Sequence, residues 1–236
     1  MKALYEEASL SFAPGAVMEL MPGDVISDSI ALAGVYELEL TRRLIRLARR
    51  PGMLVDVGAN LGYFSLLWTA ANPGNRAVAF EASPRNVELL RKNVAMNGFE
   101  DRIDIVPMAA GSRRERRYFD PGPQDQTGWG GFCASDQKGA IEVEVVRIDE
   151  TLGGDVRIDL LKIDVEGADF LVLTGCERLL RQRRIREIWY EQNKPRMETL
   201  GLPASAAQEY LEKLGYTSSP LTGTSGSVVT WLAVPA

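Results

Sequence analysis

Apolar and polar positions alternate along most of the chain between strand-like and helix-like segments. Short apolar runs predict parallel strands at residues 53–57, 76–81, 103–108, 160–165 and 185–190. Apolar residues at helical spacing predict helices at residues 27–50, 63–71, 84–97, 167–181 and 204–214. Because strands and helices alternate along the chain, the pattern predicts an α/β fold with a doubly wound and mainly parallel Rossmann-like sheet.

Other segments depart from this alternation. Residues 111–140 hold many charges, prolines and glycines, which predicts one long loop. Residues 141–148 alternate charged and apolar positions, as a half-exposed strand does. Near the end of the chain, residues 216–217 and 228–234 are typical of strands that close a hairpin, which leaves one antiparallel strand in the sheet.

A glycine-spaced turn follows the first parallel strand, in the motif DVGANLG at residues 56–62. It is no phosphate-binding P-loop, because Tyr63 rather than lysine follows Gly62. It is no dinucleotide fingerprint either, because Asn60 stands where the middle glycine belongs. A turn with a preceding carboxylate suits an amino acid, with Asp56 near its ammonium group and the turn amides near its carboxylate.

The second strand ends on Glu81, about 20 residues beyond the turn, where nucleoside-binding folds place a carboxylate on ribose. A ligand with an amino-acid end near Asp56 and a ribose near Glu81 fits S-adenosylmethionine. Met108 and Ala109 end the third strand, where adenine is expected. The predicted cofactor-binding residues are Asp56, Gly58, Asn60, Gly62, Tyr63, Glu81, Ala82, Asn86, Met108, Ala109 and Glu37.

A second group of charged residues lies in the motif LLKIDVEGADF. Lys162, Asp164 and Glu166 recur at period two, so they point to one side of the strand until it ends. A buried Lys162 needs a carboxylate partner. Asp164 and Glu166 are then expected beside the methyl donor, as catalytic candidates. The alternative for Asp164 is a structural ion pair, and the alternative for Glu166 is a helix N-cap or first-turn acid. Glu191 ends the next strand as a third acid at this edge.

Four stretches of the chain resemble the FkbM family of class I S-adenosylmethionine-dependent methyltransferases. They read GVYELE, LVDVGANLGYFSL, AFEASPRNVELLRKNVAMNGF and IDLLKIDVEGAD, and they span residues 34–191. The resemblance implies a seven-stranded sheet with an antiparallel last strand. It also implies, as the usual reaction, O-methylation of a hydroxyl on a secondary metabolite or a sugar-containing product. Tyr36 and Trp129 are the predicted acceptor-binding residues, although Trp129 is equally explained as an anchor for its loop.

The chain contains no histidine, which excludes Ser-His-Asp and Cys-His mechanisms and histidine-ligated metals. Asp164 or Glu166 is therefore the expected base. A hydroxyl is far less acidic than a carboxylic acid, so either burial raises the pKa of the base or a metal lowers that of the hydroxyl. The second possibility, Mg²⁺ held by Asp164, Glu166 and Glu191, stays open.

Composition limits the partners and the cellular compartment that we expect for the protein. A net charge of −5 argues against a nucleic-acid partner, and no apolar run approaches the ~20 residues of a membrane span. Two cysteines without a CxxC pattern fit a reduced, cytoplasmic setting. We expect an N-terminal cap at residues 1–50 and a methyltransferase domain at residues 51–236, in one globular unit whose oligomeric state the sequence does not indicate.

The leading prediction is O-methylation of a small-molecule hydroxyl. Methylation of nitrogen or carbon on a metabolite or peptide is the alternative within the same class. Two other classes stay open, a nucleotide-binding module without chemistry and an NAD-dependent oxidoreductase.

Overall fold

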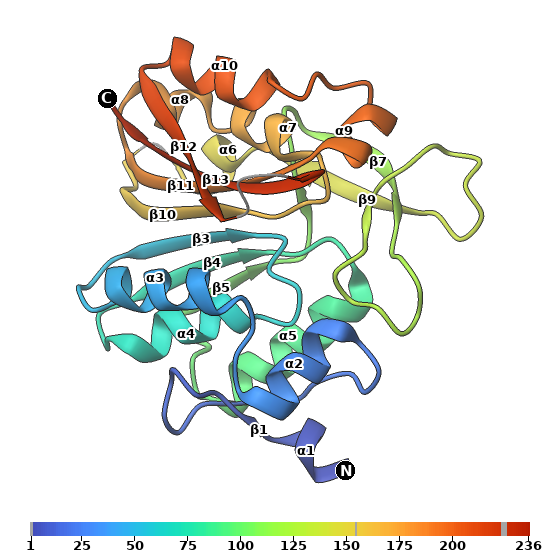
Figure 1. Ribbon diagram of the computed structural model, residues 1–236, viewed down its shortest axis with the longest axis vertical. Coiled ribbons are helices and arrows are strands. Elements are labelled where there is room, and N and C mark those ends of the chain that lie inside the picture. The colour runs from blue at the N-terminus through green and yellow to red at the C-terminus, as the bar shows by residue number, and fades with distance from the viewer. Residues whose placement is uncertain (1, 154, 223–225) are drawn as a thin grey trace. The chain divides into compact units, whose positions relative to one another are not determined.

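A computed structural model describes residues 2–153, 155–222 and 226–236 (Figure 1). It confirms the α/β fold and a mainly parallel seven-stranded sheet of order β12-β13-β11-β10-β3-β4-β5. The strands are β3 (Met53–Val57), β4 (Arg76–Phe80), β5 (Ile103–Val106), β10 (Ile158–Ile163), β11 (Ile185–Asn193), β12 (Tyr216–Thr222) and β13 (Val228–Pro235). No helix within the described residues combines the length and apolarity that crossing a lipid bilayer requires.

The chain divides into two compact units. The first comprises residues 1–107 and 121–129, and the second comprises residues 108–120 and 130–236. The chain therefore leaves the second unit after Asp120 and returns to it at Gly130. The predicted boundary at residue 50 stays a prediction.

In the first unit, β3, β4 and β5 are parallel and are joined by α4 (Tyr63–Ala71) and α5 (Pro84–Met96). Where one helix was predicted over residues 27–50, the structure has α2 (Val25–Ala33) and α3 (Leu38–Ala48), so that prediction was wrong in part. The chain breaks at Gly34, whose φ is 66° and whose added Cβ would lie 2.4 Å from Ser11 Oγ. Apolar periodicity does not detect such a close approach.

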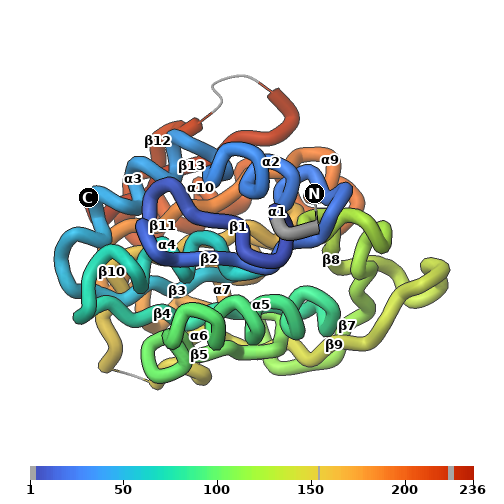
Figure 2. Tube along the Cα trace, turned by 90° about the horizontal axis from the view of Figure 1, so that it is seen from below, coloured from blue at the N-terminus to red at the C-terminus, as the bar shows by residue number. Residues whose placement is uncertain are grey.

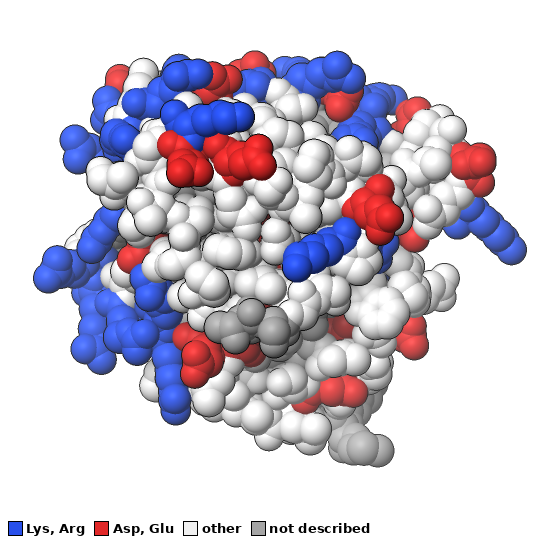
Figure 3. All heavy atoms as spheres, turned by 45° about the horizontal axis from the view of Figure 1, so that its top comes forward, with Lys and Arg blue, Asp and Glu red and all other residues white. Residues whose placement is uncertain are grey.

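Helix α3 packs against α4 (Figure 1). Leu40 and Leu44 are buried, as their spacing predicts. Basic side chains gather at the left of the view in Figure 3, and the exposed arginines of α3 and of the residues after it are Arg42, Arg46, Arg49 and Arg50.

The N-terminal segment forms α1 (Lys2–Glu6) and the antiparallel pair β1 (Ala8–Ser9) and β2 (Val17–Met18). It runs along α5 (Figure 2). Asn97 accepts a hydrogen bond from Val17 N (3.0 Å) and donates one to Val17 O (2.7 Å). Asn93 does the same with Glu19 N (2.6 Å) and Glu19 O (3.0 Å), and it also donates to Leu61 O (3.0 Å). Two side-chain amides thus pair with this backbone as a neighbouring strand would.

In the second unit, β10 and β11 are parallel, and β13 runs antiparallel to both of its neighbours, β11 and β12. The predicted hairpin is therefore confirmed, although residues 223–225 of its connection lie outside the described residues. The single helix predicted over residues 167–181 is wrong in part. The helices of this unit are α6 (Ile148–Thr151), α7 (Asp169–Thr174), α8 (Glu177–Arg181), α9 (Lys194–Thr199) and α10 (Ala206–Lys213).

A second sheet corrects the prediction of a long loop over residues 111–140. Its strand order is β6-β9-β7-β8, with β6 (Ala109–Ala110), β7 (Glu115–Asp120), β8 (Gly131–Phe132) and β9 (Ile141–Val146). Strand β7 escapes the pattern because charged residues occupy consecutive positions in it. Arg116 faces Glu142 and Glu144 of β9, at 3.5 Å and 3.9 Å, so cross-strand charge pairing replaces apolar alternation.

Candidate active site

The turn after β3 is tied to the end of β4. Gly58 N and Ala59 N both donate to Phe80 O, at 2.9 Å and 3.0 Å. Asn60, at the middle of the turn, has a φ of 54°, a left-handed conformation that only a few non-glycine residues tolerate. The turn predicted from DVGANLG is therefore present and is held in one shape.

Gly62 begins α4 and explains the second glycine of the motif. Its φ is 94°, and an added Cβ would lie 2.5 Å from Leu90 Cδ1 of α5. A side chain here would be strained by the backbone and would push α5 away. The glycine therefore serves the close packing of the turn against the next helix.

Asp56 lies within β3, and its side chain is 1% exposed. Its Oδ2 accepts a hydrogen bond from Ser65 Oγ of α4 (2.8 Å). Strand β3 covers Met53–Val57, as the apolar run predicts, so Asp56 is its second-to-last residue. Its role toward an amino group stays a prediction.

Glu81, directly after β4, is the centre of a buried polar group. Its Oε2 accepts from Asn60 N and its Oε1 accepts from Ser83 N, both at 2.8 Å. Burial raises the pKa of Glu81 to about 7, while hydrogen bonds from these amides, from Ala82 N and from the Asn86 side chain act to lower it. One carboxylate thereby joins the turn after β3 to the turn after β4.

The residues that bind Glu81 carry polar atoms that still lack partners. Asn60 Oδ1, Ser83 Oγ and Asn86 Oδ1 are buried, and none of them has a hydrogen-bond partner among the described residues. Such atoms are costly unless a ligand or water satisfies them. Ribose hydroxyls and the adenine amine supply the missing donors, so this group fits a nucleoside. Sequence reasoning missed Ser83, because a serine before a helix is ordinarily a cap.

Tyr63, Tyr36 and Glu37 meet where α3 begins. Tyr63 is 5% exposed, and its hydroxyl accepts a hydrogen bond from Tyr36 N and lies against Thr41 Oγ1, each at 3.1 Å. Burial raises the pKa of Tyr63, and the charge of Glu37 acts in the same direction. Glu37 has a φ of 44°, a further left-handed non-glycine residue. The Tyr63 hydroxyl therefore holds the start of α3 in place.

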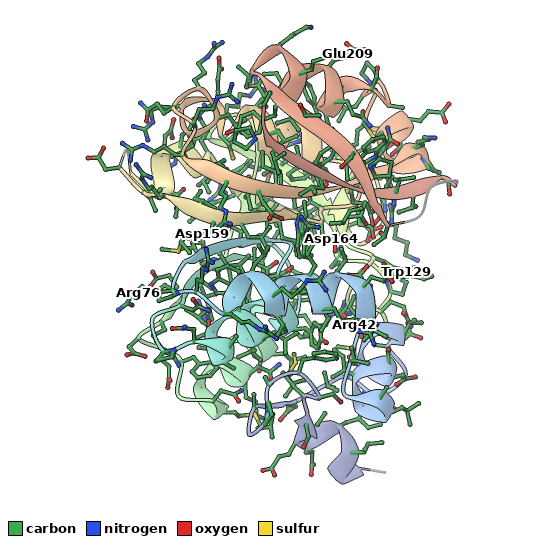
Figure 4. All side chains as sticks on the ribbon, turned by 60° about the vertical axis from the view of Figure 1, so that its left-hand side comes forward. Arg42, Arg76, Trp129, Asp159, Asp164 and Glu209 are labelled. Carbon is green, nitrogen blue, oxygen red and sulfur yellow. The ribbon has the colours of Figure 1, made fainter. Side chains whose placement is uncertain are left out.

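In the second unit, Lys162 is 4% exposed, and its Nζ lies 3.0 Å from Asp164 Oδ2. The predicted carboxylate partner is confirmed. Figure 4 labels Asp159 and Asp164 toward opposite ends of β10. The period-two expectation fails beyond Asp164, because β10 ends at Ile163 and Glu166 lies in a turn with a φ of 52°.

The structure nevertheless brings Glu166 and Glu191 together. Glu166 Oε2 accepts from Asn193 Nδ2 (2.9 Å) and lies 3.7 Å from Arg196 Nε. The same Asn193 Nδ2 lies 3.4 Å from Glu191 Oε1. Asn193 and Arg196 flank the predicted acids, and neither was expected from the sequence.

Burial and mutual repulsion raise the pKa values of these acids. The pKa of Glu191 rises to about 9, through burial and then through the charges of Asp164, Asp169 and Glu166. That of Glu166 rises to about 6 through burial and Asp164. Asp169, which accepts from Glu191 N (2.7 Å), has a pKa well above its usual range because it is buried. Burial and the neighbouring charges therefore favour the protonated form more strongly at Glu191 than at Glu166.

The described residues contain no group of three or more His, Cys, Asp or Glu side chains that could hold a metal ion. The alternative of Mg²⁺ on Asp164, Glu166 and Glu191 is therefore not supported. Asn193 and Arg196 both contact Glu166 Oε2, and Lys162 contacts Asp164 Oδ2, so one oxygen of each carboxylate is already engaged.

The remaining predicted residues lie elsewhere. The third strand ends at Val106, so Met108 follows it, and Ala109 is a buried residue of β6 paired with Val145. Trp129 is 54% exposed and ends the segment 121–129, where Figure 4 labels it. A role for any of the three in binding stays a prediction.

Known proteins match this chain. The family model described as Methyltransferase FkbM domain matches residues 56–218. Methyltransferase sdnD of Sordaria araneosa is 27% identical over 201 residues, which cover 67% of this chain and 76% of sdnD. The 31-O-demethyl-FK506 methyltransferase FkbM of Streptomyces tacrolimicus is 31% identical over 158 residues, 54% of this chain and 61% of that protein. The 2-O-methyltransferase NoeI of Sinorhizobium fredii is 25% identical over 210 residues, 81% and 84% of the two chains.

Solved structures match the fold. Methyltransferase FkbM from Methylobacillus flagellatus superposes with a TM-score of 0.54 at 18% identity, covering 78% of this chain and 43% of that one. The O-methyltransferase TomG from Streptomyces achromogenes, in complex with S-adenosylmethionine, has a TM-score of 0.50 at 16% identity and covers 86% and 82%. At these identities the likeness concerns the fold alone.

Proposed function

The chain belongs to the FkbM family of methyltransferases, and from this premise we propose that it methylates a hydroxyl oxygen of a small molecule. Its dependence on S-adenosylmethionine follows from the family. Two observations support the choice of oxygen. The matched relatives include a 2-O-methyltransferase and a 31-O-demethyl-FK506 methyltransferase, and the chain offers carboxylates with raised pKa values as bases.

The observation that carries the proposal is the buried group around Glu81. Glu81 is the proposed ribose ligand, and the unpartnered oxygens of Asn60, Ser83 and Asn86 are acceptors for nucleoside donors. The amides at the start of α4, together with Asp56, are proposed to hold the amino-acid end. When bound, S-adenosylmethionine supplies an electrophilic methyl group on a positively charged sulfur.

Acid–base work is assigned to the acids of the second unit. An effective base is ionised at the working pH and has a pKa not far below it. Glu166 meets both conditions with a pKa of about 6, so it is the proposed base, with Asp164 as the alternative. Asn193 and Arg196 orient its carboxylate. Glu191, neutral near pH 7, is proposed to donate a hydrogen bond to the acceptor.

The test has a binding arm and a transfer arm. Titration calorimetry with S-adenosylhomocysteine is expected to show one saturable site per chain. Radiolabelled S-adenosylmethionine is then incubated with pairs of small molecules that differ only in one hydroxyl, including sugars and macrolides, and with matched amines. We expect label on the hydroxylated member alone. Label on amines alone would overturn O-methylation, and absence of nucleoside binding would overturn the site.

A further inference from the structure

Residues 121–129, which we call the strap, join the first unit although the residues on both sides of them belong to the second. The proposed function gives them no role. Their contacts within the first unit are polar, specific and far apart in sequence. They lead to the residues around Glu81.

Asp24 anchors the strap near its end, at Thr127. Its Oδ1 accepts from Thr127 N (2.9 Å), and its Oδ2 accepts from Thr127 Oγ1 (3.1 Å) and Ser27 N (2.9 Å). Asp24 is 1% exposed and Thr127 is 3% exposed. A buried carboxylate is destabilising unless donors surround it, and here the strap supplies two of them.

The Arg85 side chain holds the rest of the strap by hydrogen bonds to the backbone of the strap. Its guanidinium donates to the carbonyl oxygens of Pro121 (3.3 Å), Pro123 (3.0 Å), Gln124 (2.8 Å) and Gln126 (2.9 Å). One planar cation therefore sets the path of six consecutive residues. Arg85 immediately precedes Asn86, which hydrogen bonds to Glu81.

The strap also contacts two residues that bind Glu81. Asn86 Nδ2 donates to Thr127 O (2.8 Å), which fixes the orientation of that amide and leaves its buried Oδ1 without a partner. A Cβ added to Gly128 would lie 2.7 Å from Ile26 Cδ1 and 3.8 Å from Asn60 Nδ2. The strap thus lies against Asn60 as well, whose Oδ1 is also unpartnered.

We propose that the strap forms a wall of the adenosine site, with Asp24 and Thr127 as positioning residues that aim the acceptors of Asn60 and Asn86 at the nucleoside. The inference rests on the proposed function and deepens it. A strap that only covered apolar surface would not need a buried carboxylate, and it would not determine which atom of Asn86 faces a ligand. The ligand part concerned is the nucleoside, rather than the amino-acid end or the acceptor.

The experiment compares Thr127→Val, which replaces the hydroxyl by a methyl group, with Thr127→Ser, which keeps the hydroxyl and removes the methyl group. Thr151→Val is the matched control, since it removes an exposed Oγ1 bond to Arg147 O in the second unit. Calorimetry measures two probes, S-adenosylhomocysteine and the adenosine-only fragment 5′-methylthioadenosine. We expect Thr127→Val to weaken both by about tenfold, and the other two variants to stay within about twofold of wild type.

Hydrogen exchange supplies the readout that an affinity change alone does not give. Amides of residues 121–129 are expected to exchange faster in Thr127→Val, and slower in the wild type once S-adenosylhomocysteine is bound. If Thr127→Val does not fold, Arg85→Lys replaces it, because an ammonium cannot reach four carbonyls, and the same two effects are expected.

The outcomes separate the two proposals. Unchanged affinity for both probes, or a loss in Thr127→Ser as large as in Thr127→Val, overturns the positioning role. So does a loss of affinity without faster exchange. A loss for S-adenosylhomocysteine with normal binding of 5′-methylthioadenosine overturns the assignment to the adenosine end. A wild-type protein that binds neither probe overturns the proposed function and this inference together.

Discussion

Glu81 of the first unit and Glu191 of the second are both glutamates near the carboxyl end of a parallel strand, yet their surroundings differ. Backbone amides of Asn60 and Ser83 surround Glu81, and its pKa lies at about 7. Glu191 lies among Asp164, Asp169 and Glu166, and its pKa lies at about 9.

The two environments show that the position of a glutamate at a strand end does not determine its pKa, because the surrounding groups do. Backbone donors stabilise the ionised form and fix its orientation, which suits a residue that holds a ligand. Burial raises the pKa of both glutamates, and at Glu191 the neighbouring carboxylates raise it further, which suits a residue that donates or exchanges a proton. This contrast supports the proposal that the first unit binds the ligand and that acids of the second unit exchange protons.

The sharpest test of this contrast is Glu166→Gln, which removes the proposed base without a change in shape. Turnover of any acceptor that the wild type methylates is expected to fall about 100-fold, because general-base catalysis typically contributes that much. Affinity for S-adenosylhomocysteine is expected to stay the same by calorimetry. Glu198→Gln, at an exposed position of α9, is the control. Wild-type turnover in Glu166→Gln would remove this residue from the mechanism.

Glu81→Gln tests the opposite unit. A glutamine turns one acceptor oxygen into an NH₂ group that must face the backbone N–H of Asn60 or Ser83. We expect S-adenosylhomocysteine to bind about 30-fold more weakly, roughly the loss of one charge-assisted hydrogen bond. Glu88→Gln, exposed on α5, is the matched control. If calorimetry gives equal affinities for all three proteins, Glu81 does not hold the ribose.

Gly62→Ala tests whether the turn depends on close packing. The added Cβ meets Leu90 Cδ1 at 2.5 Å on a backbone with a φ of 94°, so the free energy of unfolding is expected to fall by about 1–2 kcal/mol. Gly98→Ala also adds a Cβ at a positive φ, 63°, which lies inside the allowed left-handed region, and it meets no atom within 4 Å. Urea denaturation should therefore show a smaller loss there. Equal losses would mean that contact with Leu90 is unimportant.

The acids of the second unit predict how stability depends on pH. The pKa of Glu191 is raised from 4.5 to about 9 on folding, so the folded state binds more protons than the unfolded state between these values. The free energy of unfolding therefore falls as pH rises through this range, by less than about 1.4 kcal/mol per pH unit from this group. Between pH 7 and 9, Glu191→Gln should flatten the fall in urea titrations. An unchanged slope would contradict the assignment.

The smallest effect is expected where charges are exposed. Arg116 of β7 is 68% exposed and faces Glu142 and Glu144, which are 49% and 53% exposed. Water screens such pairs, so Arg116→Ala should change the free energy of unfolding by less than about 0.5 kcal/mol. A loss comparable to that of Gly62→Ala, measured by the same denaturation, would show that this small sheet depends on its charges.

The sequence predicted the parts of the fold that local patterns encode. Apolar runs predict the strand at Met53–Val57 and the start of the strand at Ile185. Glycine spacing predicts the turn that ends on Gly62. The cost of a buried charge predicts the pairing of Lys162 with Asp164. Lys162 was informative because a charge inside an apolar strand needs a partner.

What the sequence did not predict depends on contacts between distant residues. Asp24 and Thr127 are over 100 positions apart and resemble an ordinary helix cap and a loop residue. Gly34 ends α2 in a left-handed conformation and lies too close to Ser11 for a side chain, and consecutive charged residues conceal the strand character of β7. No local pattern carries these facts, since each residue is explained only by a partner that folding brings near.

Asn93 and Asn97 have a practical consequence for protein engineering. They hold the chain at Val17 and Glu19 through side chains, so the N-terminal segment and α5 form a matched pair. A chimera that exchanges the N-terminal segment for that of a relative must supply backbone partners for both asparagines. A shortened version that begins at residue 51 would lose the bonds to Val17 and Glu19, and Asn93 and Asn97 would keep only their bonds to Leu61 O and Asn93 O.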